Sequence, residues 1–258
     1  MLDVNAYLGH FAFRQLRYNT AAGLLHLMDA RKIERAVVSS AAAITYRNPH
    51  AGNEEVAVEV KARPDRFISF AVLNPLYAGW QDDLKTCHES LGMRGVRLYP
   101  GWHNYRLTDP LCLELVNSAA GRGMVVSIPV RVEDRRQRSW LVDVPDVSMD
   151  DIATLVRACP QAQFIIGNGT GFTNSPLGRK AAGMHSNYAI EISLVAAPPH
   201  DEMIQLLANL GEERILFGTG MPFHYPDPAM VKMELLDVPE STKEKIRRQN
   251  AIRLLKLA

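Results

Sequence analysis

Two hydrophobic patterns alternate along the whole chain. Eight mainly apolar runs each end near polar, glycine or proline residues, as β-strands do, and longer segments with helical periodicity lie between them. The predicted strands cover residues 2–6, 35–39, 67–73, 95–99, 124–130, 163–168, 188–193 and 214–219. The predicted helices cover residues 21–32, 54–63, 80–91, 111–123, 149–159, 201–209, 228–236 and 241–257.

Several helix starts carry capping residues. Thr20 precedes the first predicted helix, and Asn53 precedes the second. Ser148, followed three residues later by Asp151, resembles a capping box. Pro110 suits the first turn of a helix, where its missing N–H costs nothing. These signals support the predicted helices at their N-terminal ends.

The fold class follows from the order of the elements. Eight strands, each followed by a helix, predict a parallel α/β fold, a (β/α)8 TIM barrel that spans residues 1–258 as a single domain. An open, doubly wound sheet is the alternative architecture. It is disfavoured because no G-x-G-x-x-G turn follows any predicted strand.

Composition narrows the function classes. The formal charge of +1 gives no basic surplus for nucleic acid, and no apolar run is long enough for a signal peptide or a membrane span. Cys87, Cys112 and Cys159 have no metal-site or disulfide spacing, so we expect a reduced, cytoplasmic protein. The composition is equally compatible with a monomer and a homo-oligomer.

Three long connections follow predicted strand ends, at residues 41–52, 101–108 and 131–147. In a barrel these loops lie on the active face. Residues 132–147 of the last loop contain three arginines, several acids and Trp140, and two interpretations stay open: a solvated charged loop, or a lid over a ligand.

Several segments resemble the amidohydrolase-related family. They are RPDRFISFAVLNP, GMRGVRLYPG, CPQAQFIIGNG, ERILFGTGMPF and the terminal NAIRLL, which are distributed over most of the chain. The resemblance implies an amidohydrolase barrel and a hydrolase activity. In that family the first strand carries an H-x-H metal-binding pair, two later strands end in histidine, and a carboxylate follows the last strand.

Every matched ligand position differs in this chain. The family's ligands fall on Asn5, Tyr7, Pro129, Asn168 and Gly220. A neutral amide and a protonated phenol are poor replacements for imidazole, so we expect no catalytic metal and no cofactor. An alternative is a relocated metal site built from histidines in predicted loops, namely His10, His50, His103 and His224.

Strand parity indicates which side chains enter the barrel. In GVRLYP the apolar Val96 and Leu98 suit the helix layer, which turns Arg97 and Tyr99 inward, and the same argument turns Glu191 inward. An Arg97–Glu191 pair that only fills the barrel is one interpretation.

The other interpretation is a substrate site. Arg97 and Arg131 would present guanidinium groups to a substrate carboxylate, while Asn5, Tyr7 and Asn168 line the centre. Tyr99 completes the predicted binding residues. For acid–base chemistry we predict Glu191, His50 and His224.

Two functions remain open. The first is a metal-independent hydrolase that acts on a small anionic carbonyl compound, such as a lactone, ester or amide. The second is a catalytically inactive barrel, a pseudoenzyme, that binds a small metabolite or a protein partner. Long loops and inward charges favour the enzyme.

Overall fold

The computed structural model describes residues 1–196 and 200–257, and it confirms the predicted parallel (β/α)8 TIM barrel. Eight parallel strands form one sheet whose spatial order is the chain order. The strands are β1 (Leu2–Leu8), β2 (Arg35–Ser40), β3 (Phe67–Val72), β4 (Gly95–Arg97), β5 (Val125–Pro129), β6 (Phe164–Gly167), β7 (Tyr188–Glu191) and β8 (Ile215–Leu216).

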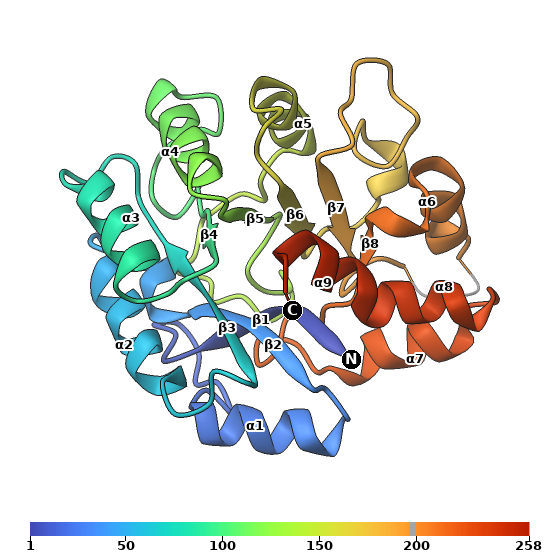
Figure 1. Ribbon diagram of the computed structural model, residues 1–258, viewed down its shortest axis with the longest axis horizontal. Helices are drawn as coiled ribbons and strands as arrows, with labels where there is room; N and C mark the ends of the chain where they lie inside the picture. Colours follow the sequence, from blue (N-terminus) through green and yellow to red (C-terminus); the bar gives the residue numbers. More distant parts are fainter. Residues whose placement is uncertain (197–199, 258) are drawn as a thin grey trace.

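The first and last strands close the barrel through single backbone contacts. Val4 N–H donates to the Phe217 carbonyl at 3.0 Å, and Tyr7 N–H donates to the Met221 carbonyl at 2.9 Å. Asp3 adds side-chain bonds to Thr219, with 2.5 Å between Thr219 Oγ1 and Asp3 Oδ2. An irregularity between Asp3 and Ala6 shifts the β1–β2 register. Figure 1 shows the strands grouped at the centre of the molecule, inside a ring of helices.

The helices are α1 (Ala21–Ala30), α2 (His50–Val60), α3 (Trp80–Glu89), α4 (Pro110–Gly121), α5 (Met149–Ala158), α6 (Glu202–Leu210), α7 (Asp227–Leu235), α8 (Glu240–Glu244) and α9 (Asn250–Leu255). A π-helical turn, Lys245–Gln249, joins the last two, so the predicted closing helix is irregular in its middle. Short 3₁₀ turns lie at Ala42–Ile44, Phe172–Asn174 and Glu212–Arg214. Within the described residues, every helix is too short or too polar to cross a lipid bilayer.

Two of the predicted caps are confirmed and one is wrong. The side chains of Thr20 and Ser148 accept bonds from backbone N–H groups in the first turns of α1 and α5. Asn53 instead lies inside α2, because that helix begins at His50. The Asn53 side chain is buried and bonds to both backbone groups of Val72, so it ties α2 to β3.

Alternation along the strands divides the core into layers. Val96, Leu98, Ile190 and Ile192 belong to the large cluster between strands and helices, as their parity predicts. The side chains on the opposite face of each strand fill the barrel interior. Near the N-terminal ends of the strands this interior holds apolar residues such as Val37 and Phe70. Helix α9 covers that end, since Ala251 and Leu255 belong to the same apolar cluster (Figure 1).

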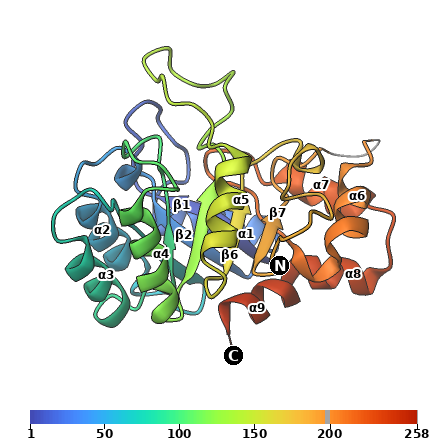
Figure 2. The same cartoon turned by 90° about the horizontal axis from the view of Figure 1, so that it is seen from above.

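The other end of the barrel carries the long loops. Figure 2 shows the loops that follow β1 and β5 projecting together, away from the C-terminus. Because the C-terminal ends of all eight strands meet at this end, its side chains form the candidate site.

Candidate functional site at the barrel mouth

A buried polar network occupies the interior below the mouth. Asn5 Nδ2 donates to Asn168 Oδ1 at 2.7 Å and to Glu191 Oε2 at 2.9 Å. The Ser193 hydroxyl lies 2.8 Å from Glu191 Oε2 and 3.0 Å from Asn168 Oδ1. Asn5 lies in β1 and Glu191 ends β7, whereas Asn168 and Ser193 lie just after β6 and β7. The network satisfies its own members, which is the condition for placing so many polar atoms inside a core.

Glu191 is the charged centre of this network. Its side chain is fully buried, and burial raises its pKa above the usual value, against the bonds from the Ser193 N–H, the Ser193 hydroxyl and the Asn168 N–H. The carboxyl group thus accepts hydrogen bonds from Asn5, Ser193 and Asn168. Because Asn5 and Ser193 also bond to Asn168 Oδ1, Glu191 helps to orient the Asn168 side chain.

Arg97 points inward, as parity predicts, but the Arg97–Glu191 pair does not form. Among the described residues no ion pair joins the two; Arg97 Nη1 instead donates to the Ala6 carbonyl at 3.1 Å and to Ser39 Oγ at 2.9 Å. Its guanidinium carbon lies 4.7 Å from the centre of the Tyr7 ring, a cation–π distance. Arg97 is completely buried and serves the barrel wall, so it reaches no ligand in this conformation.

Aromatic side chains close the mouth above Arg97. Tyr7 and Tyr99 are 0% and 2% exposed, and the Tyr99 hydroxyl is buried without a partner. Burial raises the pKa of Tyr7 well above its usual value, so the phenol stays protonated. Phe223 covers Tyr7 with ring centres 4.9 Å apart, and Phe11 contacts Phe223 at the same separation. The network below is therefore shielded from water.

His224 lies next to the network from the segment after β8. A Cβ added to Gly220 would lie 2.6 Å from His224 Cδ2 and 3.3 Å from Asn168 Oδ1, so the imidazole fills space that the glycine leaves free beside Asn168. Its Nε2 is buried and unpartnered. Burial, and then the charge of Arg14, lower the pKa of His224 to about 4, which makes it neutral at physiological pH.

Charged loop residues surround this imidazole. Arg131 follows β5, its carbonyl accepts a bond from Asn168 Nδ2 at 3.0 Å, and its guanidinium pairs with Asp146 at 2.7 Å. Arg135 and Arg138 also approach Asp146, at 3.2 and 3.5 Å. One carboxylate thus faces three guanidinium groups, which leaves positive charge in excess at the mouth.

Glu133 is the second buried acid of this loop. Its side chain is shielded from solvent, and neither carboxylate oxygen has a hydrogen-bond partner. Arg14 Nε lies 3.7 Å away, and burial raises the pKa of Glu133. The Arg14 guanidinium also donates to the Phe223 carbonyl at 2.9 Å, so the loops after β1, β5 and β8 are tied together.

The four loop histidines that a relocated metal site would require do not converge. His50 begins α2 and lies between α2 and α3, where its ring nitrogens are 3.6 Å from Asp83 and 3.8 Å from Glu54. His103 Nε2 lies 3.1 Å from the Ala43 carbonyl, and the exposed His10 contacts Asn19. Only His224 of the four adjoins Asn168.

The residues present do not fit a catalytic divalent metal ion. The five positions that match the family's ligands offer two amides, a phenol, a proline and a glycine. Both amides are engaged in the hydrogen bonds described above. Across residues 1–196 and 200–257, no three His, Cys, Asp or Glu side chains are grouped so that they could hold a metal ion.

Sequence reasoning missed several members of the site. Parity could have found Asp3, which is two residues before Asn5, and Ser193, which is two residues after Glu191. Ser39 has the same signal on β2. Arg14 lies in a loop, where no periodicity indicates direction.

Comparisons with known proteins agree with this fold. A family model described as amidohydrolase matches residues 9–257. The chain is similar to a 2,6-dihydroxybenzoate decarboxylase solved with 2,6-dihydroxybenzoate, at 21% identity over 99% of both chains and a TM-score of 0.73. It is also similar to a 5-carboxyvanillate decarboxylase from Sphingomonas paucimobilis, at 16% identity over 91% of this chain and 82% of that one, with a TM-score of 0.68.

A third similar structure is a dihydroxybenzoic acid decarboxylase from a Polaromonas species with bound manganese and the inhibitor 2-nitroresorcinol. The identity is 18% over 90% of this chain and 85% of that one, with a TM-score of 0.67. A search of curated proteins by sequence finds no match. At these identities the solved structures establish a shared fold, whereas the family model covers nearly the whole chain. This protein therefore belongs to the amidohydrolase family.

Proposed function

We propose that this protein is a metal-independent hydrolase that acts on a small anionic carbonyl compound, a lactone, ester or amide. The observation that carries the proposal is the position of His224, whose imidazole fills the space that Gly220 leaves free beside Asn168 and whose buried Nε2 has no hydrogen-bond partner. An unpaired buried nitrogen is costly in a purely structural role, because it forfeits its hydrogen bond with water.

His224 is the proposed general base. A pKa of about 4 keeps the imidazole unprotonated throughout the neutral range, so it can accept a proton from an attacking water. The rate should therefore change little from about pH 5 to pH 8 and fall as the pH approaches about 4.

Arg131 and Arg14 are the proposed source of substrate affinity. Both flank His224, and both have a buried Nε without a hydrogen-bond partner. Guanidinium groups bind carboxylates in a bidentate geometry. The complex of a similar decarboxylase with 2,6-dihydroxybenzoate supports a small carboxylate as the ligand class.

Glu191 has an indirect role in this proposal. Its carboxyl group holds Asn5, Ser193 and the Asn168 N–H, and thereby orients the Asn168 side chain beside the imidazole. Asn168 and Tyr7 are uncharged donors that can stabilise an oxyanion, the part that a metal ion plays elsewhere. We place the protein in the cytoplasm, since its three buried cysteines are free thiols.

The test is turnover of a lactone and ester panel by the wild type, His224→Asn and His10→Asn. His10 is the matched control, because it is an exposed histidine in a loop at the same end of the barrel. We expect kcat to fall by about 100-fold or more in His224→Asn and to stay unchanged in His10→Asn. Treatment with a chelator should leave the wild-type rate unchanged. Full activity of a folded His224→Asn protein would contradict the assignment.

A non-catalytic, ligand-binding barrel is the second candidate. The observation that favours it is the closed network of Asn5, Asn168, Glu191 and Ser193 beneath aromatic side chains. In that case small carboxylates from the same panel would raise the melting temperature and be recovered unchanged. Any chemically altered compound in the recovered mixture would exclude it.

A further inference from the structure

A large cavity lies at the end of the barrel opposite the mouth. Its volume is about 660 Å³, within the range of small-molecule sites. Helix α2, the first residues of β2 and β3, and the turn before β4 form its walls, and Leu257 closes one side. None of these residues belongs to the site described above.

The charges in this cavity are unbalanced. Arg35, Lys61 and Arg94 line it together with a single acid, Glu54. Within the described residues, neither Arg35 nor Arg94 forms an ion pair with an acidic side chain. The Nε of Arg35 is moreover buried without a hydrogen-bond partner. A buried guanidinium nitrogen that lacks an acceptor is expected to gain from an anionic ligand.

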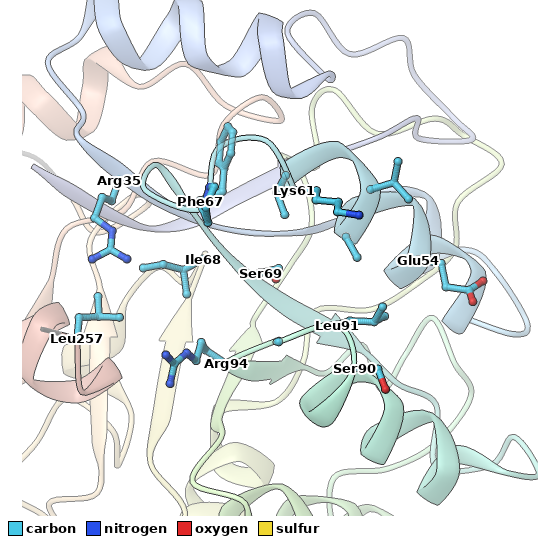
Figure 3. Close-up of a pocket in the computed structure, with 15 residues that line it drawn as sticks. Arg35, Glu54, Lys61, Phe67, Ile68, Ser69, Ser90, Leu91, Arg94 and Leu257 are labelled. Atoms are coloured by element: carbon cyan, nitrogen blue, oxygen red, sulfur yellow. The ribbon is translucent and has the colours of Figure 1, made fainter.

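Two of the three positive charges lie at one end. In Figure 3, Arg35 and Arg94 lie on either side of Ile68 and near Leu257, whereas Lys61 lies toward Glu54, which is at the opposite end. The surface between them is apolar: Ile68 and Leu257 belong to the apolar cluster at the closed end of the barrel, and Phe67 and Leu91 extend this surface. The cavity therefore has an anion-binding end and an apolar body.

We propose that this cavity binds a small amphipathic carboxylate, with its carboxylate between Arg35 and Arg94 and its apolar chain or ring against Ile68 and Leu91. Two guanidinium groups favour a planar, bidentate anion over a neutral head group. The site is separate from the proposed hydrolase site and does not depend on it.

Calorimetric titration with decanoate tests the proposal, with decanol and inorganic phosphate as comparison probes. We expect one decanoate to bind per chain at this cavity, and decanol and phosphate each to bind at least about tenfold more weakly, because each satisfies only half of the site. Binding of decanol as tight as that of decanoate would refute the role of the arginines.

Variants locate the binding. Arg35→Gln and Arg94→Gln should each weaken decanoate binding by about tenfold, and the effect should shrink in high salt. Arg122→Gln, an exposed arginine outside the cavity, should have no effect. Melting temperatures of all three variants establish that they are folded. Decanoate binding that survives both cavity variants, or that Arg122→Gln weakens as much as they do, would overturn the proposal. Loss of hydrolysis in His224→Asn with decanoate binding intact would separate the two sites.

Discussion

Asp3 makes the stability of the barrel depend on pH in a way that can be measured. Its carboxyl group is completely buried where the first strand meets the segment after the last one. Burial is the largest cause that raises its pKa, from 3.8 to about 7; bonds from Thr219 and Asn5 act against it, and the charge of Glu191 adds to it. The folded protein therefore holds a proton on Asp3 over a range of pH in which the unfolded chain does not.

The direction and the size of the effect of pH on stability follow from this difference in pKa between the folded and unfolded states. A raised pKa contributes stability that is fully present below about pH 4 and is lost as the pH rises to about 7. At 1.36 kcal/mol per pKa unit, the loss is about 4 kcal/mol at most. Asp3→Asn has nearly the same shape and does not titrate, so its stability lacks this contribution.

The measurement is urea unfolding of the wild type and Asp3→Asn at several values between about pH 4 and pH 8, followed by circular dichroism. Subtracting the unfolding free energies of the two proteins removes the contributions of groups that titrate in both. We expect the wild type to lose up to about 4 kcal/mol relative to Asp3→Asn as the pH rises through this range. A difference that stays constant with pH would refute the reasoning, because it would mean that Asp3 has the same pKa in the folded and unfolded states.

Two further predictions concern stability. Gly218→Ala should lower the free energy of unfolding by about 1–3 kcal/mol, because the new methyl group would lie 2.4 Å from Glu191 Cγ. The control is Gly9→Ala, which has a φ of +91° and nothing within 4 Å, and which should cost only about 1 kcal/mol of backbone strain. Equal losses of the two variants in urea unfolding would contradict the steric argument. Lys232→Met should lower the free energy of unfolding by about 2–4 kcal/mol, since the buried Nζ donates to three carbonyl oxygens at 2.7 Å. Lys180→Met, on the surface, should change the melting temperature little. Similar shifts in melting temperature for both variants would refute the role of those hydrogen bonds.

The fold could be predicted from local patterns. The eight strands alternate with helices, and the inward direction of Arg97, Tyr99 and Glu191 follows from period-two alternation, which depends only on the strand itself. The start of α2 shows the limit of such signals. Asn53 has the residue type of a cap, but the helix begins earlier, after Pro49, where Asn48 accepts a bond from the His50 N–H.

The partners within the site could not be predicted in the same way. Arg97 and Glu191 both point inward, yet Arg97 bonds to carbonyls of β1 and Glu191 bonds to Asn5 and Ser193. Which neighbours meet depends on the register of strands far apart in sequence. The register shift within β1 near Asp3 is a feature of this kind, since nothing in the local sequence indicates it.

The contact between Gly220 and His224 limits which residues position 220 can hold. A carboxylate at position 220 would need a Cβ that lies 2.6 Å from the imidazole, on a backbone with a φ of +74° that side chains rarely adopt. A single substitution that introduces an acid there would thus be penalised by both the steric clash and the backbone strain. The imidazole would first have to be removed or moved, so the residues at positions 220 and 224 can change only together.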